Sequence, residues 1–134
     1  MLYGKEHVQR YRETGGEEGH DWQGTQTLLL TTTGRHSGEQ RELPLIYGRN
    51  GDDYLIVASR GGSDQPPAWY LNLQADPEVE VQVMRDRFKA RARTATAEER
   101  RELWPTMTGH WPAYDDYQKK TDREIAIVIL EREG

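Results

Sequence analysis

Two glycine-punctuated turns carry most of the residues whose chemistry could serve a ligand. The first, residues 31–41 (TTTGRHSGEQR), directly follows the apolar run Leu28–Leu30 and contains Arg35, His36 and Arg41. Glycines let backbone N–H groups converge on an anion, and an arginine adds a forked, charge-assisted donor. The pattern indicates phosphate recognition. The alternative is a long hairpin loop with a solvated basic tip.

The second turn repeats this chemistry. Ser59, Arg60 and Gly61 also follow an apolar strand and combine a hydroxyl, an arginine and consecutive glycines. Two such turns in a chain with a formal net charge of -5 predict one shared anionic ligand. Trp69 lies a few residues further on and could cover a flat ring, although packing in the core is the alternative.

A third group of residues is aromatic. Trp111, Tyr114 and Tyr117 repeat every three residues, so on a helix they would share roughly one side. An aromatic stripe with this spacing is usually part of a core. Here it is flanked by charged residues, and a helix that closes over a bound ring would have the same pattern.

The spacing of apolar residues predicts the elements that must position these groups. Residues 4–14 are expected to form a short amphipathic helix, followed by a glycine- and acid-rich loop over 15–24. Strands are expected over residues 25–33, 41–48, 54–59, 78–84, 88–96 and 123–131. Further helices are expected over residues 66–77, 96–107 and 112–122.

Local signals support these assignments. Asn50 and Gly51 predict a hairpin turn, and Pro44 indicates that its strand lies at a sheet edge or carries a bulge. Thr96 stands three residues before Glu99, which is the spacing of a capping box at a helix start.

The order of these elements favours a mainly β fold with flanking helices. Six or so strands joined largely by hairpins argue against a parallel sheet, which needs a helix between most strands. We therefore expect a small, mostly antiparallel barrel with helices packed outside. It would be a single domain over residues 1–134, in which residues 1–24 form the N-terminal helix and loop. No G-x-G-x-x-G motif supports a Rossmann site.

Composition excludes several classes of protein. The chain has no cysteine, so disulfides and thiol chemistry are excluded, and its four histidines lack metal-ligand spacing. The net charge of -5 disfavours nucleic-acid binding. No apolar run approaches the roughly 20 residues that span a bilayer, and no signal peptide is visible. We expect a cytoplasmic protein.

Several segments together resemble the deazaflavin-dependent nitroreductase family of actinobacteria. They are LLLTTTGRHSG, VASRGGSDQPPAWYLNL, DPEVEVQV, ATAEER and WPAYDDYQKKTDREIAIVILE, and the resemblance runs from about residue 8 to 131. It implies a split β-barrel related to flavin-mononucleotide-binding oxidoreductases. It also implies coenzyme F420, an 8-hydroxy-5-deazaflavin, as cofactor, and a quinone-like or nitroaromatic compound as acceptor.

The resemblance also assigns roles to residues. It places Arg35, His36 and Arg41 at the phosphate and polyglutamate tail of the cofactor. The positions that match further cofactor contacts are Ser59, Arg60, Gly61, Pro44, Trp69 and Asn72.

On the acceptor side, the resemblance places Tyr114 and Tyr117 next to the substrate. Ser59 and Tyr117 are the candidates for hydrogen bonding to the acceptor or relaying its proton, and Tyr114 would shape the pocket. Three residues depart from the family pattern. His36 stands where a lysine is common, and Trp111 and Ile46 stand at positions that bear on the choice of substrate.

Two other functions stay open on the sequence. One is a flavin mononucleotide oxidoreductase on the same barrel. The other is a non-catalytic protein that stores or carries the deazaflavin. Because residues 1–14 are polar, we expect at most transient association with a membrane surface, where lipid-soluble quinones reside.

Overall fold

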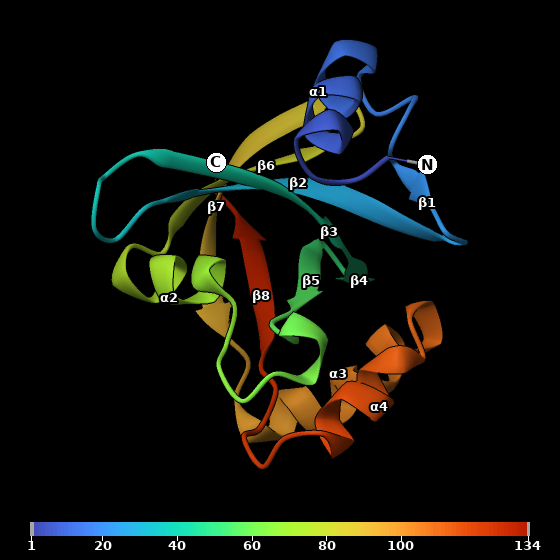
Figure 1. Cartoon of the computed structure of the whole chain (residues 1–134), viewed down its shortest axis with the longest axis vertical. Helices are drawn as coiled ribbons and strands as arrows, with labels where there is room; N and C mark the ends of the chain where they lie inside the picture. Colours follow the sequence, from blue (N-terminus) through green and yellow to red (C-terminus); the bar gives the residue numbers. More distant parts are fainter. Residues whose placement is uncertain (1, 134) are drawn as a thin grey trace.

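A computed structural model describes residues 2–133 of the chain (Figure 1). The helices are α1 (Gly4–Thr14), the 3-10 turn η1 (Arg60–Gly62), α2 (Ala68–Ala75), α3 (Ala97–His110) and α4 (Ala113–Lys119). The strands are β1 (Asp21–Trp22), β2 (Thr25–Thr33), β3 (Gln40–Ile46), β4 (Gly48–Asn50), β5 (Asp53–Val57), β6 (Glu78–Val83), β7 (Asp86–Thr94) and β8 (Ile127–Arg132). None of the described helices is long and apolar enough to cross a membrane.

The strands form one curled sheet in the order β1-β2-β6-β7-β8-β5-β4, and β3 pairs with β2. Every pairing is antiparallel. Figure 1 shows α1 above the sheet and α3 with α4 at the opposite end of the molecule. The mainly β, split-barrel prediction is confirmed. The short strands β1 and β4 were missed, because runs of two or three residues leave no readable alternation.

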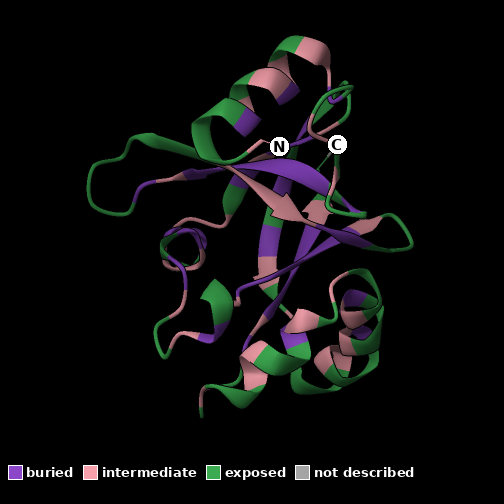
Figure 2. Cartoon of the chain, turned by 45° about the vertical axis from the view of Figure 1, so that its right-hand side comes forward, coloured by how far each residue is buried: buried purple, intermediate pink, exposed green. Residues whose placement is uncertain are grey.

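Two clusters of buried side chains form the core, one on each face of β5 and β8. Ile56 and Leu130 pack in the first cluster, with α2 and the barrel interior, and Leu55 and Ile129 pack in the second, with α3 and α4. Successive side chains of a strand point to opposite faces, so these two strands are buried on both sides. Only Asp53 of β5 and Glu131 and Arg132 of β8 are not buried, and Figure 2 shows buried segments in the middle of the sheet.

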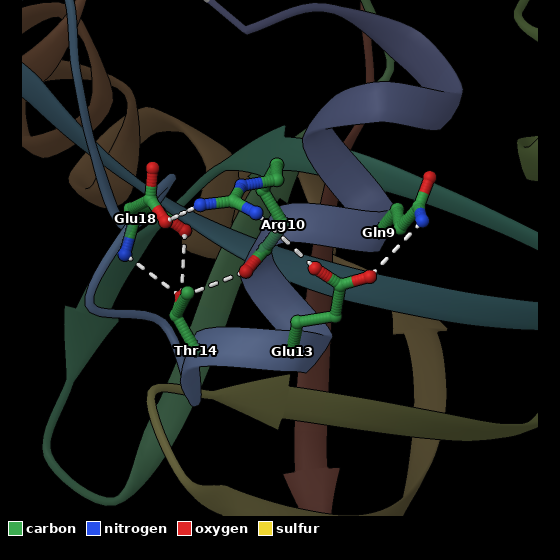
Figure 3. Close-up of polar contacts among 5 residues, drawn as sticks. All are labelled: Gln9, Arg10, Glu13, Thr14 and Glu18. Atoms are coloured by element: carbon green, nitrogen blue, oxygen red, sulfur yellow. Dashed lines mark hydrogen bonds and ion pairs between the residues drawn. The ribbon is translucent and has the colours of Figure 1, made fainter.

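The C-terminal end of α1 is fixed by a small polar network (Figure 3). The Thr14 hydroxyl donates to the Arg10 carbonyl over 2.7 Å and accepts from the Glu18 N–H over 2.9 Å. Arg10 also contacts the carboxylates of Glu13 and Glu18, and Gln9 donates to Glu13 over 3.0 Å. These contacts stop the helix and turn the chain back toward β2.

Tyr11, within the same helix, holds α1 against the sheet. The buried Tyr11 hydroxyl donates to the Thr27 carbonyl over 3.0 Å and accepts from the Met84 N–H over 2.9 Å. Burial raises the pKa of Tyr11 to about 12, so the hydroxyl keeps its proton and both bonds. The C-terminal half of α1 is thereby held to β2 and to the turn between β6 and β7.

Pro44 lies on β3 opposite Leu29 of β2, and in the described part of the chain β3 has no second strand partner. The edge-strand alternative is therefore correct. The unpaired side of β3 is where the barrel stays open, and both large cavities described below are partly lined by this strand.

The C-terminal boundaries differ from those expected. Residues 123–126 were expected in a strand, but β8 begins only at Ile127. The Ile125 carbonyl accepts a hydrogen bond from the Arg100 side chain over 2.8 Å. In a strand, this carbonyl would bond to a neighbouring strand instead. Likewise α4 begins at Ala113, so Trp111 does not share its helix with the two tyrosines and instead ends α3.

Candidate functional site

The two basic turns lie next to each other in space. Arg35 and Arg60 line one cavity of about 340 Å³ above the start of α2. Arg35 is held by α2, because the Asn72 side-chain oxygen accepts from the Arg35 N–H over 3.2 Å and from its guanidinium over 2.8 Å. Asn72 is buried and also donates to Thr32 over 3.3 Å. The expectation that both turns face one ligand agrees with this arrangement.

A second cavity, of about 520 Å³, continues from Arg35 along the first turn. The lining residues are Gly34, Arg35, His36, Ser37, Arg41, Glu42, Leu43, Ala68, Trp69 and Asn72. The carboxylate of Glu42 is paired with Arg12, whose Nε lies 2.6 Å away. Arg12 lies outside the cavity and compensates the negative charge of Glu42. The arginines that line the cavity therefore give it a net positive charge.

Trp69 offers less to a ligand than the sequence suggested. The ring lines this cavity, but the residue is only 7% exposed and belongs to the core cluster. It packs edge-on against Tyr70 with ring centroids 6.3 Å apart. Asn72 likewise uses its side chain to hold Arg35, so its role is to position another residue of the site.

The second turn presents backbone donors. Arg60, Gly61 and Gly62 have φ values of 46°, 62° and 85°, a run in the left-handed region. Within the described residues, the N–H groups of Ser59, Arg60 and Gly61 make no hydrogen bond. Successive unpaired N–H groups in a tight turn form a concave surface for anions or carbonyl oxygens.

A third cavity, of about 480 Å³, lies between the open edge of β3, the end of β5, α4 and the start of α1. The residues around it are mostly aromatic and aliphatic: Tyr3, Gly4, His7, Trp22, Thr27, Leu43, Pro44, Leu45, Ile46, Val57, Ser59, Gly61, Trp111, Tyr114 and Tyr117. Leu43 is shared with the cavity of the first turn. The cavity of the first turn and the aromatic cavity therefore adjoin at Leu43.

Tyr114 is the most unusual polar group of this cavity. The residue is 5% exposed, and its hydroxyl has no hydrogen-bond partner among the described residues. The residue lines the cavity, where a bound ligand could take up this hydroxyl. Burial raises the pKa of Tyr114, which keeps its hydroxyl protonated at neutral pH. The neighbouring Tyr117 hydroxyl accepts from the Trp111 indole over 3.4 Å.

Every residue that the sequence marked as functional lines one of these three cavities. Sequence reasoning missed Tyr3, His7, Trp22 and Thr27, which close the far side of the aromatic cavity. The Trp22 and Trp111 rings lie 6.0 Å apart, and His7 Nε2 lies 2.8 Å from the Gly19 carbonyl oxygen. Three of the four fall in the segment expected as N-terminal helix and loop, and no local pattern marked them.

A split barrel with paired basic turns opening onto an aromatic cavity defines a protein built to hold an anionic, ring-bearing ligand beside a second, apolar molecule. Residues 3–132 match the model of one family, described as F420H(2)-dependent quinone reductase. The chain belongs to this family of oxidoreductases, so the deazaflavin-dependent family expected from the sequence motifs is confirmed.

Named relatives agree with this membership. An F420H(2)-dependent quinone reductase of Mycobacterium tuberculosis strain H37Rv is 40% identical over 126 residues, which are 91% of this chain and 85% of the relative. A solved structure titled as an F420-H2 dependent reductase is 40% identical, with a TM-score of 0.73 over 78% of this chain and 93% of that one.

Another solved structure, titled a domain-swapped dimer, is 37% identical with a TM-score of 0.76. The alignment covers 95% of this chain and 96% of that one. Both structures are similar to this chain in sequence as well as in fold. The domain-swapped dimer aligns with it over nearly the full length of both chains.

The residues of the site fit the cofactor that the family name implies. F420 carries anionic groups and a planar ring. The turns offer three arginines, Arg35, Arg41 and Arg60, and a run of unpaired backbone donors beside an apolar wall. At Gly61, a Cβ atom would meet nothing within 4 Å, so the backbone of this turn is open to close approach by a ligand.

Proposed function

We propose that this protein binds reduced F420 across the two basic turns and reduces a quinone-like acceptor held in the aromatic cavity. The observation that carries the proposal is that the three cavities adjoin one another. Leu43 joins the cavity of the first turn to the aromatic cavity, and Arg35 joins it to the cavity of Arg60. A cofactor and an acceptor bound there would lie in contact.

The arginines and His36 would hold the cofactor's anions. A guanidinium forms charge-assisted, often bidentate bonds to phosphate and carboxylate oxygens. Arg35 is held in place by Asn72, while the Arg41 side chain is 58% exposed and its guanidinium lies 3.5 Å from the Glu39 carboxylate. We expect Arg35 to fix a defined anion and Arg41 to contribute a more mobile charge.

When bound, the reduced deazaflavin supplies a hydride. Reduction of a quinone to a hydroquinone also needs a proton at an acceptor oxygen. Ser59, Tyr114 and Tyr117 line the acceptor cavity and carry hydroxyls that can donate to that oxygen. An unperturbed tyrosine has a pKa of about 10, so these groups act as donors and not as bases at neutral pH.

The shape of the cavity selects a flat, apolar acceptor. Pro44 and Ile46 form one wall from β3, and Trp111 forms another at the end of α3. A quinone satisfies this environment because its ring is apolar and its polar atoms are limited to two carbonyls. Nitroaromatic compounds share the flat ring, and we include them as a second acceptor class.

We infer that the protein works in the cytoplasm and meets lipid-soluble quinones at the membrane surface only transiently. The outer face of α1 is polar, with exposed Lys5 and Glu6. Sedimentation with neutral liposomes tests this inference, and we expect most of the protein to stay in the supernatant.

A turnover assay tests the proposed reaction. The purified protein is mixed with reduced F420 and menadione, and the return of oxidised deazaflavin is followed by fluorescence. We expect oxidation that depends on both protein and quinone. Binding of F420 without any acceleration of quinone reduction would instead identify a carrier protein. A nitroaromatic acceptor in a parallel assay decides whether that class is also reduced.

A further inference from the structure

Arg123 is a charged residue that lines none of the three cavities, yet its whole guanidinium is directed at the second turn. It lies in the connection between α4 and β8. Its Nε donates to the Ser63 carbonyl over 2.8 Å, and its Nη2 donates to those of Ser59 over 2.9 Å and Gln65 over 3.4 Å. Its Nη1 donates to the Ala58 carbonyl over 3.2 Å.

These four bonds are all to backbone oxygens within residues 58–65, and the described structure contains no ion pair of Arg123 with a carboxylate. An arginine in this position is not neutralising a charge. It is holding a stretch of main chain in one conformation.

The conformation that it holds decides where the turn's donors point. In a trans peptide the C=O of one residue and the N–H of the next are directed oppositely. Because Arg123 binds the carbonyls of Ala58 and Ser59, the N–H groups of Ser59 and Arg60 must point away from it. These are two of the N–H groups that lack a partner in the described residues.

The turn also needs outside support. Arg60 has a φ of 46°, a conformation that a residue with a side chain adopts only when its surroundings enforce it. The turn itself supplies two internal bonds, from Gly62 to Ser59 over 3.0 Å and from Ser63 to Arg60 over 3.1 Å. The Arg123 bonds are the additional constraint from a distant part of the chain.

The segment that carries Arg123 is itself braced. The Gln118 side chain donates to the Arg123 carbonyl over 2.7 Å and accepts from the Ile125 N–H over 2.8 Å. Arg100 of α3 donates to the same Gln118 oxygen over 2.8 Å, and Thr121 donates to Asp64 over 2.8 Å. The guanidinium is therefore presented from a rigid base.

We propose that Arg123 is a positioning residue that aims the N–H groups of Ser59 and Arg60 at an oxygen of the bound deazaflavin. The inference rests on the proposed function, since it concerns the same cofactor. It assigns to this half-buried arginine a role in cofactor affinity that acts through the backbone, without contact between its own side chain and the ligand.

The test measures affinity for oxidised F420 by fluorescence titration, together with thermal midpoints, for the wild type, Arg123→Ala and Arg123→Lys. Arg123→Lys keeps the charge but loses the fork that reaches four carbonyls. We expect both variants to bind about tenfold or more weakly, in line with the loss of well-oriented donors. Guanidinium ion at a non-denaturing concentration should restore part of the affinity of Arg123→Ala, and sodium chloride at equal concentration should not.

Arg100→Ala is the matched control. Arg100 braces the same connection, through Ile125 and Gln118, but makes no hydrogen bond to the second turn. We expect a lower thermal midpoint and a loss of affinity clearly smaller than that of Arg123→Ala, because Arg100 acts on the turn indirectly, through the connection that carries Arg123. Wild-type affinity in folded Arg123→Lys would overturn the inference, as would an equal loss of affinity in Arg100→Ala. Failure of the wild type to bind F420 would instead contradict the proposed function, and the inference with it.

Discussion

Arg60 and Arg41 belong to different turns. Replacing each one separately therefore tests whether both turns bind one anionic ligand. We predict that Arg60→Ala and Arg41→Ala each weaken F420 binding. A lost charge-assisted contact costs roughly 1.5–3 kcal/mol, which is about tenfold or more in affinity. The loss should be smaller for Arg41, which is 58% exposed, and should shrink at high salt.

Arg87→Ala provides the control for net charge. Arg87 lies on β7, pairs with Glu80 and lines none of the three cavities. The Arg87→Ala variant should bind F420 with the affinity of the wild type. Unchanged affinity in both Arg60→Ala and Arg41→Ala at low salt would remove the case for an anion site at the turns.

Tyr117→Phe and Tyr114→Phe each remove one hydroxyl and keep the ring. For Tyr117→Phe we predict a near-normal melting temperature and F420 affinity but a clear fall in menadione reduction. Loss of a proton donor typically costs about 100-fold or more, and loss of a positioning bond costs less. Because the Tyr114 hydroxyl has no partner in the described residues, its removal should not destabilise the fold.

Kinetics of the two variants beside the wild type separate the roles of the tyrosines. Wild-type turnover in both variants would make these side chains purely structural and would leave the proton to Ser59 or to water.

Among elements, the start of α3 makes a prediction about pH. Thr96 and Glu99 form the expected capping box, and Arg93 of β7 binds the Glu99 carboxylate over 2.8 and 2.9 Å. These bonds lower the pKa of Glu99 to about 2. A carboxyl in the unfolded chain has a pKa of about 4.3, so the ionised group stabilises the fold above that pH.

We predict that Glu99→Gln lowers the thermal midpoint at pH 7 and that its difference from the wild type narrows as the pH falls from about 5 toward 2. Glu98→Gln, in the same first turn but without the Arg93 contact, should have little effect at any pH. A Glu99→Gln difference that is constant down to pH 3 would contradict the role of the ionised carboxylate.

The contact between η1 and α4 makes a second prediction at this scale. Gly62 has a φ of 85°, and a Cβ atom there would lie 2.7 Å from the Tyr117 carbonyl oxygen. We predict that Gly62→Ala destabilises the protein, by about 1–3 kcal/mol from the backbone conformation alone and by more from the clash. Gly61→Ala, with a φ of 62° and nothing within 4 Å of its Cβ, carries the conformational cost without the clash.

Chemical denaturation of the two variants measures the difference. Equal stabilities would contradict a tight contact between Gly62 and Tyr117 of α4.

Across the whole molecule, the sequence predicts what is local and misses what is brought together by folding. The alternation in β6 and β7, the Pro44 edge strand and the Thr96 capping box depend on neighbouring residues, so they were predictable. The glycine turns were also visible as turns. Their approach to each other depends on the pairing of distant strands. The family motif marked Asn72 as a cofactor contact, but its bonds to Arg35, 37 residues away in the sequence, were not predictable.

The same limit applies to the rest of the site. His7 reaches the aromatic cavity because α1 is held over the sheet by Tyr11, a tertiary contact between residues far apart in the sequence. Trp22 reaches it from β1, a strand too short to be predicted. Arg123 lies in a segment expected to be a strand, and its reach to the second turn follows from the later start of β8.

The central claim is that the site recognises a deazaflavin and not merely any flavin that a split barrel can hold. A fluorescence titration of the apoprotein with oxidised F420 and, separately, with flavin mononucleotide tests it most directly. We predict saturable F420 binding that weakens with salt, and much weaker binding of flavin mononucleotide. Tighter binding of flavin mononucleotide, or no binding of F420 at low salt by folded protein, would contradict the claim.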